Sequence, residues 1–495
     1  MFTDDARGTT WNEIRQRGMQ PFARLLTKER LQQAAQRIGL RVGGNPLNAF
    51  NLVWLGLVAA SDTTRNFAGV LAFTIKLLRD APEGSHSPLA AQTKGSRRTK
   101  KGKKTSRGGR GSRSRKVPDR LEVSEEAFVQ ARRRMPIDFW LALLAVLVES
   151  WEIDHGPKAC WKGFRLLALD GSDINLPRSQ ALAQHFGTAK NQRGGGRPQA
   201  RMVLLMFPLV RIPVRYTLVP RKISEKQAAA GLLSHLQPHD LVLLDRGFFS
   251  YGLFCQITDQ KAHFVTRKVA NAKFQTLKRL GDKDRLVRWK PADAQWRRQG
   301  LPTETILRVI DYQVSGFRAT QLVTSVLDPR QMTREEFVRL ATQTDAGRVV
   351  DPGVYHRRWE IETMLCELKV RQKMEGGLRC HAPAGIQYEV AAHVLTYLLI
   401  RWLIVEAAQE ERIDDPLRIS YLEALRELRD MASTLICATP QRLTQVLLPR
   451  LLFRVAQHLV PFRPGRHYPR PGDTRIKHRG QGRKQLPSKL LRKAA

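Results

Sequence analysis

The sequence predicts an α/β fold, in which a central region with a sheet is preceded and followed along the chain by helical regions. Two apolar runs each end in an acid, FRLLALD at 164–170 and LVLLD at 241–245, as buried strands do when their carboxyl ends carry polar groups. From residue 164 to 269 the pattern is three strands, helix, strand, helix, strand, which is typical of a sheet covered by helices. Residues 11–90 and the segment after 353 instead show apolar residues at helical spacing.

Residues 1–93 are the first predicted unit, a small helical bundle. Apolar residues recur at helical spacing from 21 to 40, Asn45 is in position to cap a helix over 46–60, and a third helix is expected over 66–78. In a basic protein such a bundle either binds DNA or serves packing and dimerisation, and the sequence leaves both possibilities open. We take it as a DNA-binding domain.

Residues 94–117 form a run of Lys, Arg, Gly, Ser and Thr, with no apolar residue before Val117. A segment that buries nothing cannot offset its ordering entropy, so we expect a disordered linker that settles on phosphates or only aids solubility. Residues 118–160 then form a helical connection, with one helix capped by Ser124 and another over 139–151.

In the central region, 161–269, we expect Asp170 to end its strand, because DGSDINLP is rich in turn-forming residues. Asp173 is then expected to cap the turn rather than to lie on the strand. The other predicted elements are paired strands at 201–210 and 214–220, a helix at 225–236, a helix after Asp245 that runs through 257, and a last strand at 263–269.

Residues 270–330 have β-like pieces at 286–289, 304–312 and 320–326, which either extend the main sheet or form an inserted subdomain. A helix at 333–342 and another over 355–369 follow, within a second central segment, 331–380. The C-terminal region 381–460 is helical, over 393–408 and 416–432. The Pro/Arg-rich tail 461–495 is expected to become ordered only on a partner.

The charge balance indicates a polyanionic partner. The net charge is +39, and the two most basic segments, 94–117 and 463–495, carry 12 and 11 Lys/Arg against one acid, Asp473. The remainder of the chain is still strongly basic, and nucleic acid is the expected compensation. An anionic membrane surface is the weaker alternative, because no basic run flanks a spanning segment.

Composition also excludes several classes of protein. The five cysteines are widely spaced and form no CxxC, which argues for a reducing compartment and against a zinc module. The sequence has no signal-peptide pattern at its start, and the apolar stretch near 390–405 is interrupted by His393 and Arg401. We therefore expect an intracellular, cytoplasmic protein with no membrane contact.

The helix over Tyr355–Lys369 carries a notable charge pattern. At about 100° per residue, Tyr355, Arg358, Glu362 and Lys369 lie within an arc of about 60°, whereas Glu360 and Glu367 point away. One acid among cationic groups suits a site that binds a metal and a phosphate. The plain alternative is a solvated face with i,i+4 ion pairs.

Three carboxylates are candidates for such a site. Asp170 and Asp245 follow strands whose carboxyl ends can share one edge of a sheet, and Glu362 can join them from the later helix. Oxygen ligands without His or Cys suit Mg²⁺ or Mn²⁺. Two such ions could activate a water or a 3′-hydroxyl and stabilise the departing oxygen of a phosphodiester.

The chain resembles the DDE transposases of the insertion element 4 family along nearly its whole length. LALDGSDINLP and LVLLDRGFFSYGLF are similar to that family's two aspartate boxes, with DGS where DGT is more usual. YHRRWEIETMLCELK matches all four positions of its Tyr-x2-Arg-x3-Glu-x6-Lys signature. LVTSVLDPRQMTREEFVRL and LTYLLIRWLIVEAA resemble the segments on either side of the signature.

The resemblance implies a ribonuclease-H-like catalytic domain with a β-rich insertion at 270–330. It implies that Asp170, Asp245 and Glu362 bind the metal ions, two per active site, and that Tyr355, Arg358 and Lys369 contact element-end DNA. It also implies cut-and-paste transposition by a bacterial, nucleoid-associated enzyme, in which two protomers synapse the inverted-repeat ends. The run at 94–117 is not part of the family pattern.

Two other functions remain open from sequence, a nuclease of the same fold that does not join strands and a basic DNA-binding protein without catalysis. Some relatives stack a flipped base on a tryptophan. Trp289, Trp296 and Trp359 are candidates here, although packing is the commoner role of such residues.

Overall fold

The computed structural model describes residues 22, 24–42, 48–61, 125–189, 196–291, 295–313, 319–339, 342–343, 349–350, 353–431, 434–435 and 438–461. The predicted helix at 66–78, the basic run 94–117 and the tail from 462 lie outside the described residues, as does the Ser124 cap.

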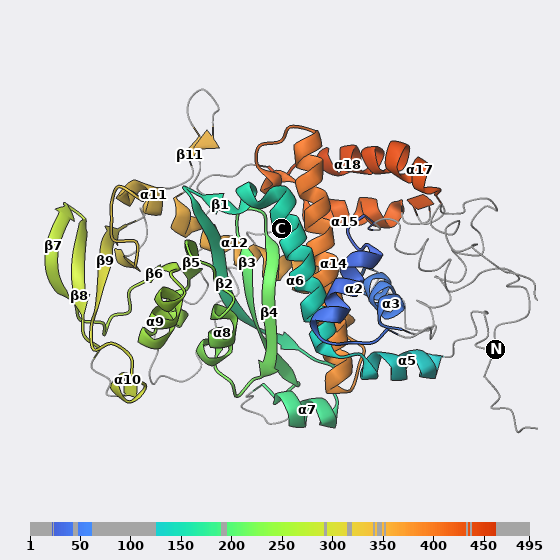
Figure 1. Ribbon diagram of the computed structural model, residues 1–495, viewed down its shortest axis with the longest axis horizontal. Coiled ribbons are helices and arrows are strands. Elements are labelled where there is room, and N and C mark those ends of the chain that lie inside the picture. The colour runs from blue at the N-terminus through green and yellow to red at the C-terminus, as the bar shows by residue number, and fades with distance from the viewer. Residues whose placement is uncertain are drawn as a thin grey trace, which may run out of the picture.

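The centre of the molecule is a mixed sheet in the order β4-β3-β2-β5-β6-β10-β9-β8-β7 (Figure 1). Its first three strands form an antiparallel meander, and β5 and β6 continue the sheet parallel to β2. This is the predicted succession of strands. The bounds are β2 (Phe164–Asn175), β3 (Gln199–Phe207), β4 (Ile212–Pro220), β5 (Asp240–Leu244) and β6 (His263–Arg267).

The β-rich segment extends this same sheet, which decides between the two arrangements that the sequence left open. Strand β10 (Thr320–Thr324) pairs antiparallel with β6, and β9 (Thr305–Tyr312), β8 (Asp284–Trp289) and β7 (Gln275–Gly281) follow outward (Figure 1). Strand β7 was not predicted, because its side chains are nearly all exposed and show no apolar alternation.

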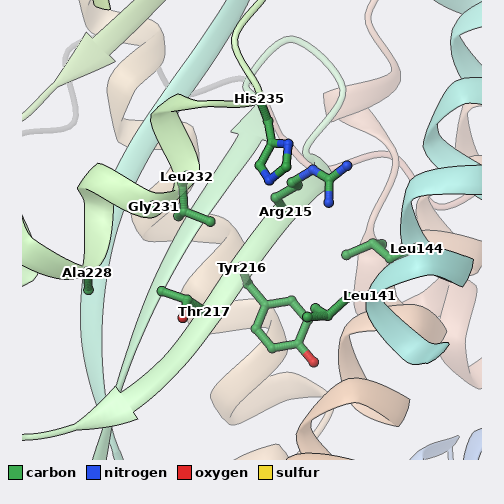
Figure 2. A pocket seen from close by; sticks show the side chains of 9 residues that line it. All are labelled: Leu141, Leu144, Arg215, Tyr216, Thr217, Ala228, Gly231, Leu232 and His235. Atoms are coloured by element: carbon green, nitrogen blue, oxygen red, sulfur yellow. The ribbon is translucent and has the colours of Figure 1, made fainter. Parts of the chain in front are cut away.

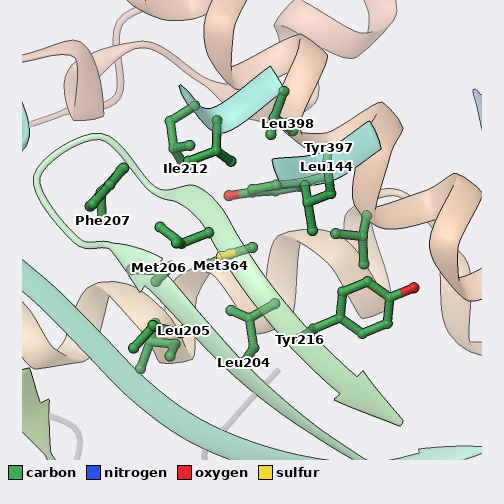
Figure 3. Close-up of a cluster of buried hydrophobic side chains, with 14 of the residues drawn as sticks. Leu144, Leu204, Leu205, Met206, Phe207, Ile212, Tyr216, Met364, Tyr397 and Leu398 are labelled. Atoms are coloured by element: carbon green, nitrogen blue, oxygen red, sulfur yellow. The ribbon is translucent and has the colours of Figure 1, made fainter. Parts of the chain in front are cut away.

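Three helices build the core against the meander. Leu144 of α6 (Ile137–His155), Met364 of α12 (Trp359–Cys366) and Leu398 of α14 (Pro383–Glu410) lie in one apolar cluster with residues of β3 and β4 (Figure 3). The helices α8 (Glu225–Leu233) and α9 (Tyr251–Asp259) pack against the strands as well. Burial of Met364 therefore anchors the helix that carries Glu362 to the sheet.

The described helices of the N-terminal region join the same core. Helix α2 (Lys28–Arg37) packs on α6, and α3 (Ala49–Ser61) packs on α14. The predicted cap, Asn45, lies outside the described residues. Asn48, which directly precedes Ala49, is in the position of a cap: its Oδ1 accepts hydrogen bonds from the backbone N–H groups of Phe50 and Asn51 at 3.1 and 3.2 Å.

Helix α14 is long and apolar enough to cross a membrane by length and composition, and 94% of its most apolar window is buried inside the protein. It is one unbroken helix. His393 and Arg401 do not interrupt it, because Gln372 bonds to His393 and Glu367 pairs with Arg401. Burial within the fold makes it a core helix.

The remaining elements are short or peripheral. They are α5 (Glu125–Arg134), β1 (Cys160–Trp161), α7 (Gln180–Phe186), α10 (Gln295–Arg298), α11 (Arg334–Val338), β11 (Thr342–Gln343), β12 (Val349–Val350), α13 (Met374–Gly377), α15 (Tyr421–Asp430), α17 (Pro440–Arg442) and α18 (Leu448–Ala456), with single-turn helices between some of them.

Candidate active site

Strand β2 continues past Asp170, so the prediction that the strand ends there was wrong. The residues DGSDIN pair with β3 up to Asn175. Asp173 is consequently on the strand and caps no turn. Its carboxylate pairs with Arg201 at 3.0 Å and with Arg221 at 3.2 Å, and these cross-strand partners stabilise an extended backbone where the local pattern favours a turn.

Asp170 and Asp245 lie at corresponding positions of two neighbouring strands, Asp245 directly after the end of β5. The parallel register pairs Leu169 of β2 with Leu244 of β5, so each aspartate directly follows a residue of that pair. Neighbouring strands lie about 4.8 Å apart. The sheet thus brings together two acids that are 75 positions apart in the sequence, as predicted from the two apolar runs.

Glu362 comes from a helix that is less regular than predicted. Residues Val354–Arg358 form a 3₁₀ turn, Trp359–Cys366 an α-helix and Glu367–Arg371 a π-helix, so a uniform 100° step is wrong here. The expectation that Glu360 and Glu367 point away from the site is confirmed. Both pair with Arg211, from the β3–β4 turn, at 2.5 and 2.8 Å.

Arg358 links the late helix to the aspartates. Its Nη1 donates to Glu362 Oε1 at 3.0 Å, and its Nε lies 3.9 Å from Asp245 Oδ1. The Arg358 side chain is only 5% exposed. One buried guanidinium thus stands between two of the three predicted acids.

Arg267 is a second cation at the site, and the sequence analysis missed it. It is the last residue of β6, the strand beside β5, and its Nη2 donates to Asp245 Oδ1 at 2.8 Å. Burial acts to raise the pKa of Asp245, but the Arg267 hydrogen bond and the charges of Arg358 and Arg267 outweigh it, so this pKa lies below its usual value. Asp245 is therefore ionised at neutral pH.

Asp170 has the opposite electrostatic environment. Burial is the main cause that raises its pKa to about 6, with the nearby charges of Asp245 and Glu362 adding to it against the Gly171 N–H and Arg358. Within the described structure its one hydrogen bond is from Gly171 N at 2.8 Å. A carboxylate with so few donors and two acidic neighbours is stabilised by an added cation.

Gly171 lies at a close approach between β2 and the side chain of Glu225. A Cβ at this position would lie 2.7 Å from Cγ of Glu225, on the first turn of α8. Glu225 thus brings a fourth carboxylate up against the strand next to Asp170. The glycine of the first aspartate box serves this contact rather than a turn.

Tyr355 and Lys369 flank the acids. Tyr355 is 4% exposed, burial raises its pKa to about 12, and its hydroxyl has no well-formed hydrogen bond within the described residues. Lys369 Nζ donates to Ser172 Oγ at 3.0 Å and to the Asp173 carbonyl at 2.8 Å, and lies 3.4 Å from Glu375 Oε2. Lys369 is thus bound to β2 two to three positions beyond Asp170.

The donors fit a hard divalent cation in their chemistry. Asp170, Asp245 and Glu362 offer only oxygen atoms, and Asp170 lacks a cationic hydrogen-bond partner in the described structure. The three side chains are not arranged as a complete set of metal ligands, since the described residues contain no group of three or more His, Cys, Asp or Glu that could hold a metal ion.

The three tryptophans differ sharply in environment. Trp289 is buried among Phe249, Tyr251 and Phe254, and Trp296 packs against Tyr251, which are core roles. Trp359 is 51% exposed, immediately after Arg358.

A cavity of about 200 Å³ lies elsewhere, between α6, β4 and α8, with Arg215 and His235 near one end and Tyr216 and Leu141 near the other (Figure 2). None of the candidate acids lines it.

Comparison with known proteins gives the class. Residues 161–399 match the family described as the transposase DDE domain. The match begins just before β2 and ends within α14, so it contains all six candidate site residues.

The chain is similar, more particularly, to an IS4 transposase. The transposase InsG for insertion sequence element IS4 of Escherichia coli (strain K12) is 26% identical over 359 residues, which cover 70% of this chain and 76% of that protein. Among solved structures, a piggyBac transposase synaptic complex with hairpin DNA overlaps 94% of this chain and 88% of that chain, at 10% identity and a TM-score of 0.37, too low to carry an argument.

Proposed function

We propose that this protein is a transposase that cleaves DNA at the ends of its insertion element and joins the freed ends to target DNA by cut-and-paste transposition. The observation that carries the proposal is the placement of Asp170 and Asp245, each directly after a residue of the Leu169–Leu244 pair of two parallel strands, with Glu362 connected to Asp245 through Arg358. The transposase DDE domain at 161–399 and the similarity to the IS4 transposase favour the same function.

In this proposal Asp170, Asp245 and Glu362 hold two Mg²⁺ or Mn²⁺ ions. Such ions supply activation of a water or 3′-hydroxyl and stabilisation of the departing oxygen. Arg267 holds Asp245 Oδ1 and so fixes the orientation of that carboxylate, while the burial of Asp170 strengthens its attraction to a cation.

Tyr355, Arg358 and Lys369 are the proposed contacts to the element end. Lys369 lies beside β2 and Tyr355 is buried near Arg267, Arg358 and Asp245, so a phosphate at the acids is within reach of cationic and hydroxyl donors. Trp359 is the favoured stacking surface for an unpaired base, because it is exposed where Trp289 is enclosed.

The strand order β4-β3-β2-β5-β6 favours a ribonuclease-H-like catalytic domain made of 161–269 and 331–380, with 270–330 inserted. The basic net charge favours DNA as the partner. Two protomers in a synaptic complex, with residues 1–93 and the basic segments on DNA of the bacterial nucleoid, complete the proposal.

A cleavage and strand-transfer assay tests it. Linear DNA that carries the element ends is incubated with the protein and Mg²⁺, Mn²⁺ or Ca²⁺. We expect joined products with Mg²⁺ or Mn²⁺, and their loss in Asp170→Asn, Asp245→Asn and Glu362→Gln variants that still bind DNA. Cleavage without joining would instead identify a nuclease, and neither product would identify a binding protein.

A further inference from the structure

The centre of the candidate site already contains a positive charge supplied by the chain. Arg358 donates to Glu362 at 3.0 Å and lies 3.9 Å from Asp245, so its guanidinium bridges two carboxylates from different elements. A divalent ion held by these carboxylates would occupy the same space between them.

We propose that Arg358 is the internal counter-ion of the metal-free site, and that its guanidinium must leave the position between Asp245 and Glu362 when a divalent ion binds there. This inference rests on the proposed function, because it assumes that the acids bind metal. Arg358 then has two positions: one between the acids in the metal-free protein, and a later one in which it contacts a phosphate.

The hold of Arg358 on the acids is incomplete, which suits a group that must be released. Its Nε is buried and makes no hydrogen bond within the described part of the chain, and the 3.9 Å approach to Asp245 is an ionic contact only. A buried donor without a partner costs free energy. Arg358 therefore gains a full set of acceptors if it turns toward a phosphate.

Arg267 differs from Arg358 in what it touches. It donates to Asp245 Oδ1 from the neighbouring strand β6 at 2.8 Å, and within the described residues it forms no ion pair with Glu362. It can keep this bond while the other oxygen of Asp245 binds an ion. Arg267 is thus a positioning residue that stays, and Arg358 is the group that is displaced.

The charges make metal and DNA binding interdependent. Three carboxylates with Arg358 and Arg267 carry a net charge of −1, and two divalent ions would change it to +3. A phosphodiester offsets that excess and also accepts the displaced guanidinium. Bound DNA should therefore increase metal affinity, and metal should increase affinity for DNA ends by the same factor.

The test measures Mn²⁺ binding to the full-length protein without DNA, by calorimetry and by electron paramagnetic resonance of free Mn²⁺. We expect Arg358→Gln and Arg358→Ala to bind Mn²⁺ about tenfold more tightly than the unaltered protein, within the usual range of coupling between sites. Arg267→Gln removes a charge that lies 2.8 Å from the same carboxylate, and it reports the gain from lowering the local positive charge without displacing a group from between the acids. Arg330→Gln, a 91% exposed arginine paired with Asp328, should change nothing.

A larger gain for Arg358→Gln than for Arg267→Gln supports displacement. Equal gains, or no gain, overturn it and leave the proposed function standing. If the unaltered protein shows no Mn²⁺ binding that is lost in Asp170→Asn, the proposed function is overturned, and this inference is overturned with it. Circular dichroism establishes whether each variant is folded. If Arg358→Ala is not folded, the comparison is made with Arg358→Gln alone.

Discussion

Replacing Asp170 with asparagine should stabilise the metal-free protein at pH 8. Burial raises the pKa of Asp170 from 3.8 to about 6, so the folded state holds this proton more tightly than the unfolded state does. Roughly two pKa units correspond to about 3 kcal/mol that the ionised carboxylate costs. Residual contact with water reduces this, so we expect a gain of about 1–3 kcal/mol. Asparagine can still accept the Gly171 hydrogen bond.

The raised pKa also fixes how the stability difference between wild type and Asp170→Asn changes with pH. The wild-type penalty is absent well below pH 3.8, where Asp170 is protonated in both states, grows as pH rises from there, and is complete once pH has risen past about 6. Urea unfolding in EDTA at several pH values should therefore show an advantage for Asp170→Asn that shrinks from pH 8 to pH 4. Asp173→Asn on the same strand is the control, and it should destabilise because it loses Arg201 and Arg221. A destabilised Asp170→Asn, or an advantage independent of pH, would refute the reasoning.

Three further predictions concern residues in and around the candidate site. Gly171→Ala should cost roughly 0.5 kcal/mol or less in urea unfolding, because the added Cβ meets the outer atoms of the flexible, 38% exposed Glu225 side chain, which can turn aside; Glu225→Ala in a double-mutant cycle should remove what cost remains. Glu367→Ala removes the carboxylate that pairs with two buried arginines and should cost about 3–5 kcal/mol, whereas Glu335→Ala, at a 67% exposed side chain, should change thermal unfolding very little. Trp359→Ala should weaken binding of end DNA that contains an unpaired base by about 1–3 kcal/mol in fluorescence titration, with unfolding unchanged; equal loss for fully paired DNA would contradict stacking.

Much of the central fold could be predicted because the buried strands consist of continuous runs of apolar residues. The runs at 164–170 and 241–245 predicted both strands, and the rule that carboxyl ends of parallel strands share an edge predicted the closeness of Asp170 and Asp245. The run HFVTRKV predicted the next strand over 263–269, but the observed strand β6 ends at Arg267, and this earlier end is what places Arg267 at the same edge.

Other features depend on contacts that local pattern does not contain. The residues DGSDIN favour a turn, yet pairing with β3 and the bonds of Asp173 to Arg201 and Arg221 keep them extended. The π-helix at Glu367–Arg371 coincides with the anchoring of Glu367 by Arg211 and Arg401 and of Lys369 by β2. Such π segments are frequent at functional sites. Tertiary bonds, and not helical periodicity, set the direction of Lys369.

The separation between Asp170 and Asp245 is a property of main-chain hydrogen bonding between two strands. Exchanges among the flanking leucines can loosen or tighten the core, but they cannot lengthen that gap gradually without breaking the ladder. A gene copy that accumulates substitutions should therefore keep its acid spacing intact until it loses an acid outright or ceases to fold. Decay of this centre is expected to be abrupt.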